Sequence, residues 1–493
     1  MPRIWLLSVS LPAMACIYGV VFGAPEPAGW YAGDIHVHRS CGGSPTALSE
    51  LKNAMETNQL SFMSVLADMG NGEVQDAKAD LPKVTGIDDP VSTAGRTVRW
   101  DAEWHWDPDG VTFPITRLGG HVVLLRLTQA LKDSTSEYTY PVFQYAHNKG
   151  GIAGFCHFQH FDAGTATVPP TSFNCCYAME YPVEAALGSC DFISEDVSGG
   201  IITTNHYYKL LNCGFRVGLA AGTDRPCGQD QIGKLLTYGK ASTASYNNWV
   251  QAIKDGKTVI SRNGHNEFLN LVVNSTAGPG DQINITSART ISISVTWSAI
   301  QSLSGTIQVV INGTTVAAQN AFVTPSSPAT LSADVVIDRS SWICARRMSG
   351  GEHQSHTAAV FVLVNNAPIR ASATDAQYFI TWCDNLLTRT ANGGAWAKYF
   401  QNQLSAARAR YQQAKNLYAQ IKAEALQATR TLQSEQVNER ENPAVFHYGY
   451  NLHGKLLYKT ASASIPAMRN SGKAIMVSTK QSGRTVIIRV ISR

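Results

Sequence analysis

Trp30-Tyr-Ala-Gly-Asp34-Ile-His36-Val-His38 is the stretch on which the predicted fold and function of this chain depend. Side chains alternate across a β-strand, so His36 and His38 leave the same face and can reach one ion. Imidazole is a common ligand of zinc and other first-row metals, but a site needs further ligands. Without them, two strand histidines with backbone partners explain the pair equally well.

Four more residues of ligand type follow, and most of them stand where apolar segments begin or end: Glu103, His121, His157 and Asp224. His157 and Asp224 each end a short apolar run, as expected of barrel strands that carry ligands at their carboxyl ends. His121 instead precedes the apolar run 122–125. We therefore expect His121 to enter the site from a loop.

The order of these residues resembles that of the PHP (polymerase and histidinol phosphatase) metallohydrolases, and more closely their carbaryl-hydrolase-like (CehA/McbA) subgroup. That subgroup opens with a Trp-Tyr-x-Gly-Asp-(apolar)-His-x-His run, which residues 30–38 match. Two later segments of the subgroup have counterparts here, Gly233-Lys-Leu-Leu-Thr-Tyr238 and Ser261-Arg-Asn-Gly264. The resemblance covers about residues 29–385 and implies an α/β fold, a PHP-type distorted (βα)7 barrel.

The resemblance also implies two divalent metal ions that share one carboxylate. The implied ligands are His36, His38, Glu103 and Asp224 for one ion, and Glu103, His121 and His157 for the other. Three-metal members of the family carry three more histidines, and this chain has Ser44, Met69 and Pro226 at those places. The implied cofactors are therefore two ions, zinc before manganese or iron, although imidazole and carboxylate ligands accept all three.

Two ions that share a carboxylate can activate water and polarise a phosphoryl or carbonyl oxygen. Three residues near the ligand motifs are candidate catalytic groups: Asp68, Arg39 and Arg225. Asp68 ends an apolar run and could transfer a proton, or it could cap the next turn. The arginines could steady an anionic group, or they could form surface salt bridges. We predict a metal-dependent hydrolase that cleaves a small-molecule phosphoester or a carboxylic or carbamate ester.

Two other interpretations stay open. Amidohydrolases use a similar order of His-x-His, bridging carboxylate, two histidines and aspartate, on an eight-stranded barrel. The second interpretation is a non-catalytic secreted binding or adhesion protein on a decayed PHP scaffold. Its main support is that Met69 and Pro226 stand where the family has histidines. No Gly-x-Ser-x-Gly elbow with downstream Asp and His is present, so a serine nucleophile is not predicted.

Residues 1–24 have the features of a secretory signal peptide: Arg3, an apolar stretch from Ile4 to Phe22, and small residues before Pro25. A membrane anchor is the alternative, because the stretch could just span a bilayer. No later segment is long and apolar enough to cross a membrane. Nine of the ten cysteines follow this segment, which suits an oxidising compartment. We expect a secreted, periplasmic or cell-surface protein.

The composition is that of an ordinary globular protein, with 44% hydrophobic residues, 15% charged residues and a net charge of +4. So small a charge predicts no nucleic-acid partner, because such partners call for lysines and arginines clustered on one face. The length of 493 residues is enough for more than one domain.

The periodicity changes along the chain and divides it into four predicted parts after the leader. They are an α/β barrel over 29–278, a small antiparallel β-sandwich over 281–390, a long amphipathic helix over 394–430 and a basic β-module over 444–493. His356 could reach the barrel mouth or be structural. The last module has no Asp or Glu and weakly resembles modules used for type IX secretion and cell-surface attachment.

Overall fold

The computed structural model describes residues 23–70, 77–105, 120–158, 167–170, 178–196 and 200–441, and four strands beyond residue 444. The predicted signal peptide falls almost wholly on residues 1–22, which lie outside the described residues. The chain forms two compact units, residues 1–422 and 423–493. Within the described part of the chain, we find no helix with the length and apolar character to span a bilayer.

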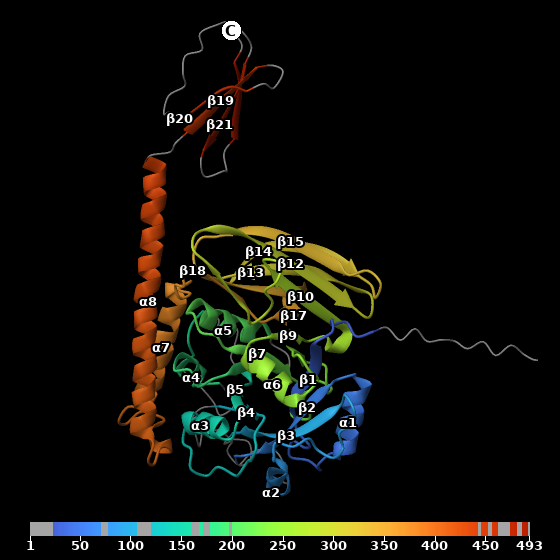
Figure 1. Ribbon diagram of the computed structural model, residues 1–493. Coiled ribbons are helices and arrows are strands. Elements are labelled where there is room, and N and C mark those ends of the chain that lie inside the picture. The colour runs from blue at the N-terminus through green and yellow to red at the C-terminus, as the bar shows by residue number, and fades with distance from the viewer. Residues whose placement is uncertain are drawn as a thin grey trace, which may run out of the picture. The chain divides into compact units, whose positions relative to one another are not determined.

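The first unit is built on a mixed sheet whose strands alternate with helices (Figure 1). Its first seven strands are β1 (Trp30–Val37), β2 (Phe62–Asp68), β3 (Thr97–Trp104), β4 (Val122–Leu125), β5 (Ile152–Phe155), β6 (Phe192–Asp196) and β7 (Gly218–Gly222). Strands β1, β2 and β3 run parallel, as do β5, β6 and β7, and all seven are buried over most of their length. Burial on both faces explains why β2, β4, β5 and β7 are continuously or almost continuously apolar.

Strand β4 runs antiparallel to both of its neighbours, β3 and β5. Its amino-terminal end therefore lies at the edge of the sheet where the neighbouring strands end. His121 directly precedes β4 and reaches that edge for this reason. The reversed direction of β4 explains why His121 precedes its apolar run, whereas His157 and Asp224 follow theirs.

Helices connect and cover these strands. They are α1 (Leu48–Thr57), α2 (Ala77–Asp80), α3 (Tyr140–Asn148), α4 (Tyr181–Ala186), α5 (Gly200–Asn212) and α6 (Tyr246–Lys254), with short 3-10 turns at Leu81–Lys83, Gly264–Asn266 and Ala397–Tyr399. Trp249 of α6 is fully buried with Phe62 and Val123. A Cβ at Gly33 would lie 2.5 Å from the Trp249 ring, and one at Gly239 would lie 2.6 Å from it. Glycine at these strand positions lets the helix approach the sheet closely.

The sheet curls so that the end of β7 returns to β1. Beyond β7, the Asp224 N–H donates to the His36 carbonyl and the His38 N–H donates to the Arg225 carbonyl, both at 2.7 Å. A Cβ at Gly222 would lie 2.6 Å from the Cβ of His36, so glycine is needed for this approach. The contact brings the two most distant ligand motifs of the sequence together.

The mixed sheet continues beyond the αβ units. Its other strands are β8 (Leu236–Lys240), β9 (Thr258–Ser261), β11 (Gln282–Ile285), β13 (Leu303–Ile311), β14 (Thr314–Val323), β16 (Ser341–Ser349), β17 (Glu352–Thr357) and β18 (Val360–Val364). Strand β17 pairs with β9, so strands of the predicted sandwich join the same ladder as β1. A separate antiparallel sheet contains β10 (Glu267–Val273), β12 (Arg289–Ala299) and β15 (Ala329–Ile337).

Two helices follow the last strand of this unit. Helix α7 (Ala373–Arg389) lies beside α8 (Leu404–Glu441), and Lys415 of α8 pairs with Asp384 of α7 at 2.5 Å (Figure 1). The sequence predicts the long helix from residue 394, whereas it begins at Leu404. The carboxylate of Glu137 accepts the backbone N–H groups of residues 401–403, which fixes the start of the helix.

The second unit contains a four-stranded antiparallel sheet in the order β20-β19-β21-β22. Its strands are β19 (Val445–Asn451), β20 (Leu456–Ala461), β21 (Ala474–Lys480) and β22 (Val486–Ile491). The period-two pattern of the sequence predicts β21 and β22. A role of this sheet in secretion or attachment stays a prediction.

Candidate metal centre

The six predicted ligands come together at the edge where β1, β3, β5 and β7 end and β4 begins. Glu103 lies at their centre, and its two carboxylate oxygens face different imidazoles. Oε2 lies 3.0 Å from His38 Nε2 and 3.5 Å from His36 Nε2. Oε1 lies 3.0 Å from His121 Nδ1 and 3.6 Å from His157 Nε2. One carboxylate therefore stands between two pairs of histidines.

Asp224 completes the first half of the cluster. Its Oδ1 lies 3.2 Å from His36 Nε2 and 3.4 Å from His38 Nε2, and the two Nε2 atoms are 3.1 Å apart. All of these side chains are buried. His38 Nδ1 is also buried and has no hydrogen-bond partner among the described residues. Among the described contacts, the position of the His38 ring is therefore set by the groups that its Nε2 faces, Glu103, Asp224 and His36.

The backbone turns sharply at two of the six residues. His157 and Asp224 have left-handed φ angles of 62° and 52°, which side chains other than glycine seldom adopt. Asp34 supports the turn at Asp224, because its carboxylate accepts the Thr223 N–H at 3.0 Å and the Thr223 hydroxyl at 2.6 Å. Left-handed residues of this kind gather at functional sites.

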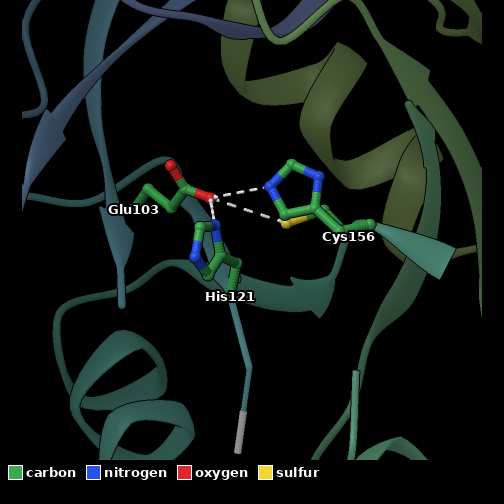
Figure 2. Close-up of side chains that lie close together, drawn as sticks. Glu103, His121 and Cys156 are labelled. Carbon is green, nitrogen blue, oxygen red and sulfur yellow. Dashed lines mark hydrogen bonds and ion pairs between the residues drawn. The ribbon is translucent and has the colours of Figure 1, made fainter. Parts of the chain in front are cut away.

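Three residues that sequence reasoning missed join the cluster. Asp196 ends β6, accepts the His157 N–H at 2.9 Å and lies 3.2 Å from His36 Nδ1. The Cys156 thiol lies 3.6 Å from Glu103 Oε1 (Figure 2). His105 stacks on His121 with ring centroids 4.4 Å apart. His105 stands two residues after Glu103, so period-two spacing was a usable signal for it.

A disulfide between Cys41 and Cys227 lies directly beyond the ligand motifs. Each cysteine follows a predicted ligand by three residues, Cys41 after His38 and Cys227 after Asp224. The bond joins segments separated by 186 residues. It therefore ties the two loops that carry the first half of the cluster.

Opposite charges in the cluster stabilise each other without metal. Burial lowers the pKa of His36, but Asp224 and Glu103 outweigh burial and raise it well above its ordinary value. Burial acts in the same way on His38, and hydrogen bonds with Asp224 and Glu103 raise its pKa to about 9. Burial raises the pKa of Glu103, whereas His36 and His121 bring it well below its usual range. The carboxylates thus stay ionised.

The donor set fits divalent metal ions. Ligand atoms within 4.8 Å of one another form several overlapping groups, among them Glu103 with His121, Cys156 and His157, and His36 with His38 and Glu103. A nitrogen and carboxylate set of this kind suits zinc, manganese or iron. The described cluster could therefore hold two ions that share Glu103.

The candidate catalytic residues lie around this cluster in different ways. The Asp68 carboxylate accepts the Gly70 N–H at 2.7 Å, as in a turn cap, and also lies 3.7 Å from His105 Nε2. Arg39 pairs with Asp80 at 2.7 Å, the contact expected of a salt-bridge arginine. Arg225 contributes its backbone carbonyl, which binds His38 N–H. Catalytic roles for all three stay predictions.

Two other features lie away from the cluster. His356 on β17 is buried, and its Nε2 lies 2.5 Å from the Tyr208 hydroxyl, which is a structural contact. A hollow of about 430 Å³ is lined by residues that include Arg216, Gly218 and Lys257. Gly218 begins β7, whereas Asp224 follows its other end, so this hollow is not the metal centre.

Comparison with known proteins finds similarity among solved structures only. No family model and no curated protein matches the chain. Among solved structures, matches include the CARDB domain of a Pyrococcus furiosus protein in two forms, one in solution and one crystallised in complex with di-metal ions. The identities are 18% and 17%, the TM-score is 0.15 in both cases, and each match covers 20% of this chain and 96% of the domain.

Proposed function

We propose that this protein is a metal-dependent hydrolase of the PHP superfamily, of the CehA/McbA type, with two divalent ions. The placement of Glu103 carries the proposal. Each of its oxygens faces a separate pair of imidazoles at 3.0–3.6 Å. A carboxylate between two sets of nitrogen ligands is the arrangement expected of a bridge between two ions.

The order of the ligands along the chain and the course of the sheet support the same proposal. The parallel runs β1–β3 and β5–β7, and the return of β7 to β1, are compatible with a distorted (βα)7 barrel. The strand ends that meet at one edge carry the residues that the PHP resemblance implies. We therefore propose that the curled sheet is a distorted (βα)7 barrel.

Paired divalent ions supply Lewis acidity, which activates water and polarises a phosphoryl or carbonyl oxygen. The residues of this chain would position these ions and balance their charge. Asp196 accepts from His36 Nδ1 and so directs Nε2 toward the cluster. Asp34 holds the turn that presents Asp224. Asp68 and His105, 3.7 Å apart, can hold and pass a proton beside Glu103.

The proposed reaction is hydrolysis of a phosphoester or of a carboxylic or carbamate ester. The test uses the purified full chain, with metal content measured by elemental analysis after dialysis. It then assays p-nitrophenyl phosphate, bis-p-nitrophenyl phosphate, p-nitrophenyl acetate and an aryl methylcarbamate before chelation, after chelation, and after zinc or manganese is restored.

We expect about two metal equivalents per chain and turnover of one substrate class that chelation removes and metal restores. Turnover of the phosphates alone would assign a phosphoesterase, and turnover of the carbamate or acetate alone would assign the ester chemistry. A protein that retains no metal, folds normally and turns over none of the four substrates would contradict the proposal.

A further inference from the structure

The thiol of Cys156 belongs to the same cluster as the predicted ligands. Its Sγ lies 3.6 Å from Glu103 Oε1. The ligand atoms of Glu103, His121, Cys156 and His157 all lie within 4.8 Å of one another. Figure 2 shows the Cys156 sulfur and the His121 ring directed at the same Glu103 oxygen. Sulfur, oxygen and nitrogen donors therefore surround one small volume.

Two of the three separations from Glu103 Oε1 match those between ligands of one ion, and the third, to His121, is a hydrogen-bond distance. Bonds of about 2.0–2.3 Å to oxygen, nitrogen and sulfur place neighbouring ligands of a tetrahedral zinc about 3.3–3.6 Å apart. From Glu103 Oε1, the corresponding distances are 3.0 Å to His121, 3.6 Å to His157 and 3.6 Å to Cys156. The sulfur lies at the distance expected of a ligand that shares an ion with Glu103.

The backbone explains how two consecutive residues face one ion. Along β5, neighbouring side chains leave opposite faces of the sheet, so Cys156 and His157 would diverge in a regular strand. The left-handed φ of 62° at His157 breaks that alternation. The conformation is costly for a residue other than glycine. It returns the imidazole to the side on which the thiol already lies.

The other free cysteines with described surroundings provide a contrast. Cys190 is also buried, but its Sγ donates to the Phe192 carbonyl at 3.1 Å. Cys213, Cys344 and Cys383 are buried among apolar residues of the main core. None of these four belongs to a described group of metal-ligand type. Among the free cysteines that the structure describes, only Cys156 has its thiol within a histidine and carboxylate cluster.

We propose that Cys156 is a thiolate ligand of the second ion, together with Glu103, His121 and His157. The inference rests on the proposed two-metal centre. On binding, the bond from Sγ to the metal forms, and the thiol proton leaves to solvent. A sulfur ligand favours zinc, cobalt and cadmium over magnesium, calcium and manganese. The second site would therefore choose its metal more strictly than the first.

The test loads the metal-free full chain with cobalt(II) and records its absorption spectrum. A cobalt–thiolate bond gives an intense charge-transfer band in the near ultraviolet, which nitrogen and oxygen ligands do not give. We expect the band in the wild type and in Cys190→Ser, a matched buried thiol, and its loss in Cys156→Ser. We also expect Cys156→Ser to bind one zinc equivalent at least about 10-fold more weakly, because changing residues that only orient a ligand already costs about 10–100-fold.

A second measurement needs no variant. X-ray absorption at the zinc edge of the wild type should show sulfur scattering at about 2.3 Å, the usual zinc–sulfur distance. Two bound cobalt ions without the charge-transfer band, or zinc without a sulfur shell, would overturn the assignment of Cys156 and leave the proposed hydrolase intact. The band without turnover of any substrate would support Cys156 and count against the hydrolase. Failure to bind any metal would overturn both.

Discussion

Strand β6 carries two adjacent buried carboxylates that face different surroundings, Glu195 and Asp196. Glu195 forms ion pairs with Arg262 at 3.0 Å and with His353 at 2.9 Å. Asp196 lies on the other face, where it contacts His36 and the backbone of His157. Neighbours on one strand thus belong to two different kinds of cluster.

The difference lies in what balances the negative charge. On the Glu195 side, an arginine supplies a permanent positive charge, as Arg347 does for Glu267 at 2.8 Å. On the Asp196 side, the described contacts of Glu103 and Asp224 are made chiefly by imidazoles. An imidazole binds a metal only when it is neutral at that nitrogen, so metal and proton compete there. We therefore expect Glu195, which has a guanidinium partner, to be structural, and Glu103 and Asp224, which face several imidazoles, to be the carboxylates that could bind metal.

Glu103→Gln is expected to have the largest effect on metal content and activity, and Glu195→Gln is its matched control. Loss of the central carboxylate should release at least one of the two ions and lower hydrolysis on the order of 10³-fold, the upper range for one electrostatic group. Elemental analysis and the substrate assays measure both effects.

Glu195→Gln should keep both ions and most of the activity. It should lower the free energy of unfolding by about 1–3 kcal/mol, the cost of leaving a buried polar group partly unsatisfied. Arg262 retains Glu352 at 2.5 Å, which limits the loss. If Glu195→Gln released metal as readily as Glu103→Gln, the distinction between the two kinds of cluster would be wrong.

A smaller effect is expected from Asp196→Asn. This change keeps the side-chain volume and an acceptor for the His157 N–H, but it weakens the hold on His36 Nδ1. Metal affinity, measured against a chelating dye, should fall about 10–100-fold, as for other carboxylates that orient a ligand histidine.

The control is Asp191→Asn, near the opposite end of the same strand. Asp191 pairs with His147 at 2.7 Å and with Lys254 at 3.2 Å. Its variant should leave metal affinity unchanged. Equal losses in both variants would mean that β6 acts only by supporting the fold, and Asp196 would then have no positioning role.

The six side chains that meet in the cluster are the ones that the PHP resemblance implies, and most of them stand where an apolar run begins or ends. Cys156 and Asp196 were not predictable in the same way. Strand alternation places Cys156 opposite to His157, and only the left-handed φ at His157 reverses this. Asp196 joins because β6 lies beside β5 in the sheet, which depends on pairing between distant segments.

Long-range contacts also account for the errors in the fold. The direction of β4 depends on how its ends connect, and periodicity does not report it. The pairing of β17 with β9 joins the predicted barrel and sandwich strands into one ladder. The start of α8 depends on Glu137, more than 260 residues earlier in the chain. Local sequence patterns carry none of this information.

The smallest expected effect extends the comparison to a buried histidine outside both clusters. Burial lowers the pKa of His206 to about 3, and Lys209 adds to this effect. Its Nδ1 lies 2.7 Å from the Tyr181 hydroxyl. The pKa of His206 thus shifts in the direction opposite to those of His36 and His38, which Asp224 and Glu103 raise.

The sign of the pH dependence follows from this shift. The folded pKa lies below the unfolded value of 6.5, so the contribution to stability is complete above pH 6.5 and is lost as the pH falls toward 3. At pH 5 the loss of stability should be about 2 kcal/mol, since each pKa unit corresponds to about 1.4 kcal/mol.

Urea unfolding at pH 7.5 and pH 5 measures this loss of stability, with His206→Gln as the reference. The wild type should lose about 2 kcal/mol more than the variant over this interval, because all other titrating groups are common to both proteins. Equal losses of stability in the wild type and the variant would mean that His206 is protonated as readily in the folded protein as in the unfolded one. The pKa of His206 would then not be lowered by burial.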